Sequence, residues 1–386
     1  MSTRNHVDLQ AAAAQTMRAR GFLPDFPPEV DRQLAELAAH PPSVVASAGT
    51  GGIRDLRALV WSSIDNDTSR DLDQLEVVEP LPGGETKVLI AIADVDAFVA
   101  KHSAIDAHAA LETTTVYTGV RNFPMLPEAL STGTTSLLEG ADKLAMVIEF
   151  GVSADGNVHS GTLYRAVVRN KAQLTYDAVG AWLEHRGPAP PKVAASADLQ
   201  QQLTLQDACA QRLLSARNQH GALNIETIET RPIWLNGAVV DLARQQKNRA
   251  TELIEDFMIA ANEVVARALE DVSSIRRVVK TPKRWDRIVD LARESGTELP
   301  GEPDSKALNA FLLARKQADP DHFVDLSLTV IKLMGPGEYV LERPGDPESG
   351  HFGLAVQDYT HATAPNRRFA DLVDRKSTRL NSSHRP

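Results

Sequence analysis

The sequence predicts an α+β fold in which a β-rich core is flanked by helices. Residues 59–170 contain β-branched and apolar runs, such as KVLIAIADV and KLAMVIEFGV, and turn residues such as PGG and ADG separate them. Beyond Leu174 the pattern becomes helical, because stretches such as RATELIEDFMIAANEVVARALED place apolar residues three and four positions apart. Strands followed by helices are typical of the α+β class, so we expect one large domain of this kind.

Three segments follow one another along the chain. Residues 1–50 hold two helical patterns with a Pro-containing break between them, and the Pro-, Gly- and Ser-rich stretch at 40–52 predicts a linker. Residues 51–375 carry the predicted domain. Residues 376–386 read KSTRLNSSHRP, which resembles the translation of a sequencing adapter. We therefore expect this tail to be non-native and the natural chain to continue beyond Arg375, and we exclude the tail from functional reasoning.

Composition and charge narrow the class of protein. Of the 386 residues, 42% are hydrophobic and 24% are charged, which is typical of globular chains. The net charge of −10 provides no global attraction for phosphate, so a nucleic-acid site would have to be a local basic groove. The single cysteine, Cys209, excludes an internal disulfide. Because no export signal and no apolar stretch of about 18 residues occurs, we expect a cytoplasmic protein without a membrane segment.

The most informative stretch is SSIDNDTSRDLDQ, residues 62–74. It crowds Asp65, Asp67, Asp71 and Asp73 into an otherwise apolar neighbourhood. Carboxylates a few ångströms apart raise one another's pKa, so their convergence on one side would call for a cation that offsets the repulsion. Oxygen ligands select hard cations, and Mg²⁺ is commonly held by a few carboxylates together with water and phosphate.

Three interpretations of this stretch remain open from the residues alone. The first is a solvated acidic loop between strands. The second is a calcium-binding EF-hand loop, but its sixth position would be Arg70 where a glycine is needed, and both flanking runs look like strands. The third is a divalent-metal site for phosphoryl transfer, in which paired ions stabilise the attacking and leaving oxygens.

Further segments join this stretch in a family resemblance. In order they are IDNDTSRDLDQ, IADVDAFV, residues 116–138, KAQLTY, LIEDFMIAAN and HFGLAVQDYTHATAPNRRFADL. Together they resemble the catalytic domain of the ribonuclease II and ribonuclease R family, the RNB-type 3′ to 5′ exoribonucleases. The resemblance covers about residues 54–375, and it implies Mg²⁺-dependent hydrolysis of single-stranded RNA to nucleoside 5′-monophosphates.

The resemblance assigns roles to the acidic residues. Asp65, Asp71 and Asp73 match the family's metal site, and Asp73 and Asp71 are our choices for the catalytic carboxylates. The family usually has a fourth aspartate directly after the position of Asp73, and this chain has Gln74 there. Because glutamine is neutral, the site has one negative charge fewer. We therefore expect it to hold its second metal ion more weakly, unless Asp67 or Asp94 takes the place of the missing aspartate.

Other residues match the family's RNA-contacting positions. Arg367 matches the arginine that contacts the scissile phosphate, Arg368 follows it, and Pro365 is expected to begin a helix there. The alternative for the two arginines is a surface pair with Asp371 as partner. Among the remaining positions the resemblance implies RNA binding by Tyr176, Tyr117 and Glu255, with Asp256 as the alternative to Glu255.

The leading hypothesis is thus an Mg²⁺-dependent exoribonuclease acting on single-stranded RNA. In it Asp65, Asp71 and Asp73 hold the metal, and Arg367 clamps the phosphate. The alternative is a catalytically silent RNA-binding homologue with a regulatory role, which Gln74 and the atypical end of the chain favour.

Overall fold

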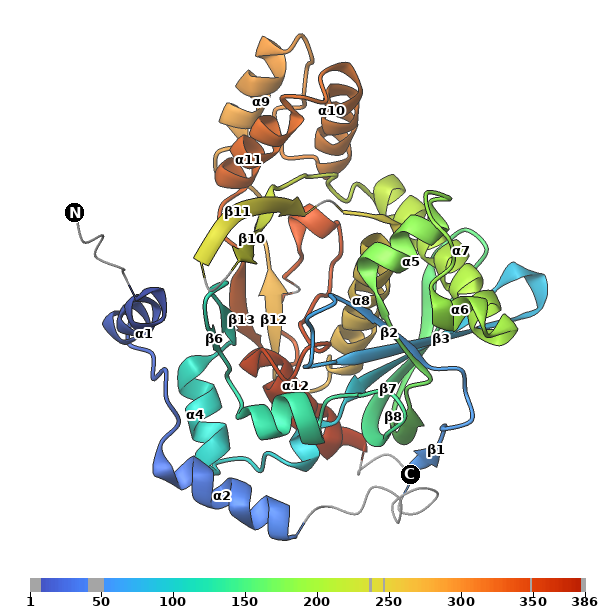
Figure 1. Cartoon of the computed structure of the whole chain (residues 1–386). Helices are drawn as coiled ribbons and strands as arrows, with labels where there is room; N and C mark the ends of the chain where they lie inside the picture. Colours follow the sequence, from blue (N-terminus) through green and yellow to red (C-terminus); the bar gives the residue numbers. More distant parts are fainter. Residues whose placement is uncertain (1–7, 41–51, 236–237, 246, 348, 383–386) are drawn as a thin grey trace.

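A seven-stranded mixed sheet forms the centre of the protein, as a computed structural model that describes residues 8–40, 52–235, 238–245, 247–347 and 349–382 shows (Figure 1). The strand order is β1-β8-β7-β4-β3-β2-β9. The strands are β1 (Arg54–Asp55), β2 (Ser62–Asp65), β3 (Gln74–Pro80), β4 (Thr86–Ala93), β7 (Asp142–Val152), β8 (Val158–Arg169) and β9 (Ala172–Thr175). The inner strands pair antiparallel, whereas β1 and β9 join the two ends in parallel. The sheet and its helices confirm the predicted α+β class.

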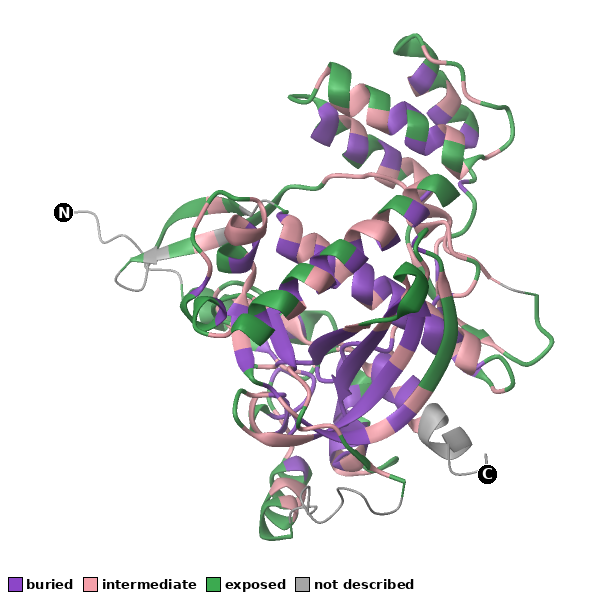
Figure 2. Cartoon of the chain, turned by 90° about the vertical axis from the view of Figure 1, so that its right-hand side faces the viewer, coloured by how far each residue is buried: buried purple, intermediate pink, exposed green. Residues whose placement is uncertain are grey.

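Both faces of the sheet are covered, so its central strands are apolar on both sides. In β4, Val88, Ile90 and Ile92 face one hydrophobic cluster, while the residues that alternate with them face another. The first cluster is covered by α5 (Tyr176–Leu183), α7 (Ala197–His220) and α8 (Arg249–Ala268), and α4 (Ala104–Glu112) contributes to the second. Figure 2 shows the resulting band of buried strands through the molecule. This explains why KVLIAIADV is continuously apolar instead of alternating.

Two helices precede the sheet. Helix α1 (Leu9–Ala19) begins after Asp8, whose carboxylate accepts from the first backbone N–H groups, and α2 (Pro28–Ala39) has proline in its first turn. Helix α2 packs beside α4. Most of the linker predicted at 40–52 lies outside the described residues. Helix α12 (Phe369–Ser382) ends the described chain and takes in the first residues of the tail.

The second half contains strands that the sequence analysis did not predict. A hairpin of β10 (Glu229–Leu235) and β11 (Ala238–Gln245) and a pair of β12 (Ser274–Val278) and β13 (Glu338–Glu342) interrupt the helices. The purely helical prediction beyond Leu174 was therefore wrong for these segments. Both pairs lie apart from the main sheet, and their strands lack the continuous apolar runs of its central strands.

The remaining elements complete the chain. Helices α9 (Trp285–Glu294), α10 (Ser305–Ala318) and α11 (Phe323–Met334) share a hydrophobic cluster of their own. The short elements are β5 (Val116–Tyr117), β6 (Asn122–Phe123), α6 (Pro191–Ala194) and the single turns η1 (Pro82–Gly84), η2 (Val95–Ala97), η3 (Ala129–Thr134) and η4 (Phe352–Leu354). Among the described residues, no helix combines the length and apolar composition needed to cross a membrane.

Candidate active site

The acidic residues gather where β2 ends and β3 begins. Asp65 is the last residue of β2, and Asp73 directly precedes β3. The antiparallel pairing of β2 with β3 at Ser62 and Glu76 brings the two strands together, and the Asp73 carboxylate is close enough to Asp65 to raise its pKa. Strands β2 and β3 flank the acidic loop, whereas an EF-hand loop is flanked by helices, so the EF-hand interpretation is excluded. The local fold therefore places two carboxylates close together at one end of the sheet.

Asp73 is buried and is held from the far end of the chain. Its side chain is 1% exposed, and the Asn366 backbone N–H donates to Oδ1 at 3.1 Å. Arg367 Nε lies 3.2 Å from Oδ2 as an ion pair. Burial raises the pKa of Asp73 to about 7, although Arg367 opposes the shift and Asp71 adds to it. An additional cation at this position would reverse the rise.

Asp65 shares this environment. Burial raises its pKa to about 7, Arg367 lowers it, and Asp73 and Asp71 raise it further. Gln74 donates a side-chain hydrogen bond that favours the charged form. Neither Asp65 Oδ2 nor Asp73 Oδ2 accepts a hydrogen bond from the described residues. Asp73 Oδ2 lies in its ion pair with Arg367, whereas Asp65 Oδ2 is buried without a hydrogen-bond donor among the described residues.

Asp71 is turned toward a tyrosine. The Tyr117 hydroxyl donates to Asp71 Oδ2 at 2.7 Å, and the Tyr117 side chain is 52% exposed. Burial of the hydroxyl and the nearby Asp71 charge raise the pKa of Tyr117 above its usual value, so the hydroxyl stays a donor. The hydrogen bond therefore links Tyr117, which the family resemblance matches to an RNA-binding position, with Asp71, which it matches to the metal site.

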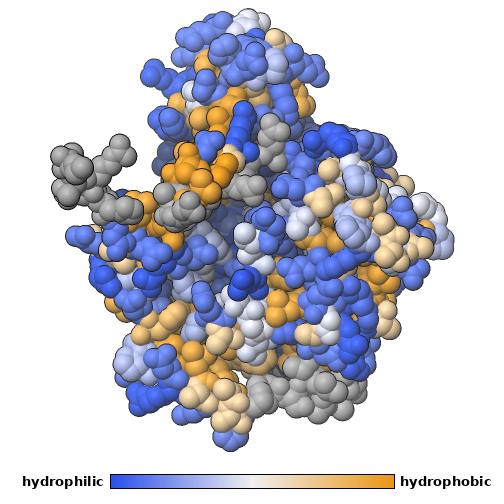
Figure 3. All heavy atoms as spheres, in the orientation of Figure 1, coloured by the Kyte–Doolittle hydropathy of each residue, from blue (hydrophilic) through white to orange (hydrophobic). Residues whose placement is uncertain are grey.

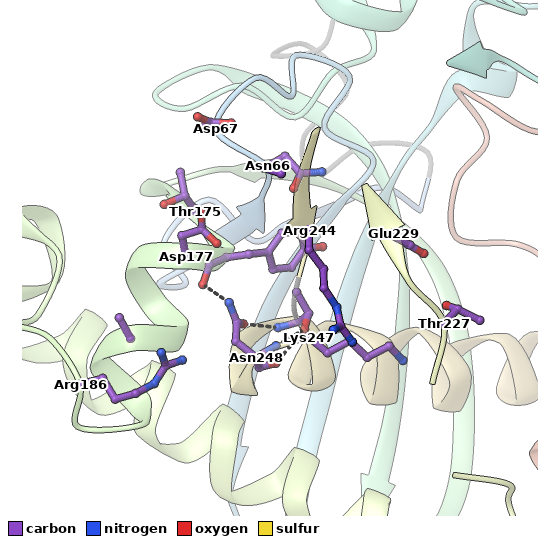
Figure 4. Close-up of a pocket in the computed structure, with 14 residues that line it drawn as sticks. Asn66, Asp67, Thr175, Asp177, Arg186, Thr227, Glu229, Arg244, Lys247 and Asn248 are labelled. Carbon is purple, nitrogen blue, oxygen red and sulfur yellow. Dashed lines mark hydrogen bonds between the residues drawn. The ribbon is translucent and has the colours of Figure 1, made fainter. Parts of the chain in front are cut away.

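Tyr176 is the first residue of α5. Burial and the carboxylates of Asp65 and Glu76 raise its pKa, which places its hydroxyl near both acids. Tyr176 also lines a cavity of about 610 Å³ under the hairpin β10–β11 (Figure 4). Arg244 and Lys247 are among the lining residues in that view, and the Asn248 side chain donates to the Tyr176 carbonyl at 3.1 Å.

Glu255 and Arg368 lie farther from the carboxylates. Glu255 forms a 2.7 Å ion pair with Lys247, and both line a second cavity of about 400 Å³ with Asp256. Asp256 is itself 1% exposed and pairs with Arg217. Arg368 pairs with Asp371 at 2.8 Å, but Asp371 is fully buried, so the partner predicted by the alternative is right and its surface location is wrong. Helix α12 begins only at Phe369, so the expectation that Pro365 begins a helix was wrong; a turn precedes the helix instead.

The residues present fit a hard cation in their chemistry. The donors are carboxylate oxygens, and two of them are buried without a hydrogen-bond donor. Within the described ranges, however, no group of three or more His, Cys, Asp or Glu side chains is arranged to hold a metal ion. The Asp71 carboxylate accepts from Tyr117 through Oδ2, and Asp73 faces Arg367. Of the two substitutes considered for the missing aspartate, Asp94 is already paired with Arg165 at 2.7 Å.

Sequence reasoning missed Glu76 in this region. Its side chain is fully buried, and neither carboxylate oxygen accepts a hydrogen bond from the described residues. Burial, with a contribution from Asp65, raises its pKa well above the usual value. The signal was available, because a glutamate two residues after Gln74 in an apolar strand must share that residue's face of the sheet.

Comparisons with known proteins agree with this arrangement. The model of the RNB domain matches residues 53–376. Ribonuclease R 1 of Lactococcus lactis is 30% identical over 367 residues, which cover 93% of this chain and 43% of the relative. The chain therefore spans less than half the length of that curated relative.

Two solved structures share the fold. Mycoplasma genitalium RNase R in complex with ribose-methylated single-stranded RNA aligns with a TM-score of 0.84 at 24% identity, covering 93% of this chain and 55% of that one. Yeast Ssd1, described as a pseudonuclease, aligns with a TM-score of 0.69 at 18% identity, covering 86% and 41%. Because the family model matches residues 53–376, which is most of the chain, the chain belongs to the RNB-domain family.

Proposed function

We propose that this chain hydrolyses single-stranded RNA from its 3′ end in an Mg²⁺-dependent reaction that releases nucleoside 5′-monophosphates. The observation that carries the proposal is the meeting of Asp65, Asp73 and Arg367, which come from distant parts of the chain, at one end of the sheet. Membership of the RNB-domain family supports the same reaction class.

The acidic residues would hold the metal. Asp65 and Asp73 offer their buried oxygens, and Asp71 lies within electrostatic reach of both. A bound Mg²⁺ supplies hydroxide near neutral pH and offsets the charge that builds on the scissile phosphate. Burial is the main cause of the raised pKa values of Asp65 and Asp73, and a bound cation would lower both pKa values.

Arg367 would orient the phosphate. Its guanidinium contacts Asp73 through Nε, while its side chain remains 46% exposed. The carboxylates around it raise its pKa, so it stays charged, and its other N–H groups can donate to phosphate oxygens. A residue that touches both the buried carboxylate and the substrate phosphate can align the scissile bond with the metal position.

The tyrosines suit a substrate of any base sequence. The half-exposed Tyr117 donates its hydroxyl to Asp71, and Tyr176 is close enough to Asp65 for that carboxylate to raise its pKa. Stacking of a base on an aromatic ring is worth about 1–3 kcal/mol and tolerates every base. We propose this role for both rings, and a ribose or phosphate contact for Glu255 at the second cavity.

A degradation assay tests the proposal. Single-stranded RNA labelled at its 5′ end is incubated with the protein, with Mg²⁺ or with EDTA. We expect a ladder that shortens from the 3′ end only with Mg²⁺, and no shortening of a DNA strand of the same sequence. Internal cleavage, or an intact RNA under all conditions, would contradict it.

A second candidate function is RNA binding without catalysis. It is favoured by Gln74 in place of an aspartate and by the lack of a preformed three-ligand group among the residues described. The assay above separates the two, because RNA binding without any metal-dependent product would support this alternative.

A further inference from the structure

Tyr117 connects the RNA side of the site to the carboxylate side. Its hydroxyl donates to Asp71 Oδ2 at 2.7 Å, and about half of its side chain is exposed. Asp71 lies on the loop between β2 and β3, so the hydrogen bond crosses from β5 to another element. Stacking on a base needs only the ring, so the hydroxyl is available for a different task.

The segment that carries Tyr117 is also bonded to the backbone around Arg367. The Thr115 N–H and the Thr114 hydroxyl both donate to the Arg367 carbonyl at 2.9 Å. The Phe369 N–H donates to the Thr113 carbonyl at 2.8 Å. Residues 113–117 therefore contact the phosphate-clamping arginine through the backbone and the metal-site loop through a side chain.

We propose that Tyr117 is a positioning residue whose hydroxyl orients the Asp71 carboxylate toward the metal, so that RNA binding and metal binding reinforce each other. The inference rests on the proposed function and adds a role for the hydroxyl that stacking does not require.

The physical basis is the restriction of one side-chain torsion. A carboxylate on a loop samples several rotamers, and a hydrogen bond from a fixed donor selects one of them. A base stacked on the Tyr117 ring restricts the ring, and through the hydroxyl it restricts Asp71 as well. Such coupling is reciprocal, so bound metal must strengthen RNA binding by the same factor.

The test compares Tyr117→Phe with the wild-type protein by calorimetric titration of Mg²⁺. Titrations are done with and without a short ribose-methylated RNA. Since the variant loses one hydrogen bond to a charged group and keeps the ring, we expect its Mg²⁺ dissociation constant to rise about three- to tenfold. The RNA should tighten Mg²⁺ binding in the wild type and much less in the variant, while RNA affinity measured in EDTA stays the same.

Tyr164→Phe provides a matched control. Tyr164 also donates its hydroxyl to a carboxylate, that of Glu149 at 2.5 Å, but it lies on β8, three strands away from β3 in the sheet. We expect this variant to bind Mg²⁺ as the wild type does. Tyr117→Leu, which loses the ring as well, should weaken RNA binding in EDTA in addition to Mg²⁺ binding.

Two results would overturn the inference. One is an unchanged Mg²⁺ affinity and an unchanged effect of RNA in Tyr117→Phe. The other is a loss of RNA affinity in EDTA in Tyr117→Phe as large as that in Tyr117→Leu, which would assign the hydroxyl to the RNA. Failure of the wild type to shorten RNA with Mg²⁺ would instead contradict the proposed function, and the affinities distinguish the two failures.

Discussion

Gln74 leaves the carboxylate site one negative charge short of the pattern that the family resemblance implies. It is 3% exposed, and its side chain hydrogen-bonds to Asp65. We predict that Gln74→Asp lowers the Mg²⁺ dissociation constant by on the order of tenfold, because a nearby charge attracts the cation more strongly. Calorimetric titration checks this. Gln219→Asp, which adds the same charge at an exposed position of α7, should leave the affinity unchanged. Equal effects of the two substitutions would contradict the prediction.

Glu76 makes stability depend on pH. Its pKa in the folded protein is raised above the ordinary value of 4.5. Below pH 4.5 the carboxyl group is protonated in both the folded and the unfolded chain, and its contribution to the free energy of unfolding is at its maximum. As the pH rises further, the unfolded chain releases the proton that the folded chain keeps, and stability falls by at most about 1.4 kcal/mol per pH unit.

Glu76→Gln removes this loss, since an amide does not titrate. We predict that the variant is similar in stability to the wild type near pH 4.5 and increasingly more stable than it toward pH 8. Urea unfolding in EDTA at several pH values measures the difference, and Asp65 and Asp73 titrate in both proteins. A constant difference across this range would show that Glu76 is charged in the folded protein.

Most of the site positions could be named from the sequence only through the family resemblance. Spacing alone identified the crowding of Asp65, Asp71 and Asp73, because they are close in the chain. The contacts of Asp73 with Asn366 and Arg367 could not follow from spacing, since 293 positions separate Asn366 from Asp73. The hydrogen bond from Tyr117 to Asp71 was missed for the same reason.

At the level of elements, one turn shows how closely the helical layer packs on the sheet. Gly156 joins β7 to β8 with φ of 87°, and a Cβ there would lie 2.1 Å from the Arg212 carbonyl oxygen on α7. Gly156 is therefore required both by its backbone conformation and by the contact with α7.

We predict that Gly156→Ala lowers the free energy of unfolding by about 2–4 kcal/mol, the sum of left-handed strain and overpacking. Gly296→Ala is the control, because Gly296 has φ of 76° with nothing within 4 Å of the added Cβ. It should cost only about 1–2 kcal/mol. Denaturant unfolding of both variants gives the comparison, and an equal loss would show that α7 moves away without cost.

Elements with a regular apolar pattern were predictable, and those without one were not. Strands β4, β7 and β8 and helices α7 and α8 have long patterns of one period, and the sequence predicted them. The hairpin β10–β11 was missed, although the Asn236–Gly237 pair, which lies outside the described residues, is a strong hairpin signal. Its strands expose Ile233, Leu235 and Leu242, so apolar periodicity did not mark a buried face (Figure 3).

Over the whole molecule, the fold brings four distant segments to one end of the sheet. Asp73 comes from the β2–β3 loop and Tyr117 from β5. Tyr176 is at the start of α5, and Arg367 is in the turn before α12. The sequence predicted the α+β class from its patterns, but patterns carry no information on which loops meet. The net charge of −10 also gives no sign of the site, because its cations are few and local.

The central claim is that Asp73 and its neighbours form the catalytic metal site. The most direct test measures the rate of 3′ shortening of a labelled RNA in Mg²⁺ for the wild type, Asp73→Asn and Asp207→Asn. Asp207 matches Asp73 as a largely buried aspartate in an ion pair with an arginine, Arg249 at 2.7 Å, but it lies on α7 and pairs with the first residue of α8.

We predict that Asp73→Asn slows shortening by at least about 100-fold, as expected for loss of a main electrostatic contribution, while the protein stays folded and still binds RNA. Asp207→Asn should stay within a few-fold of the wild-type rate. An Asp73→Asn protein that shortens RNA as fast as Asp207→Asn would contradict the account.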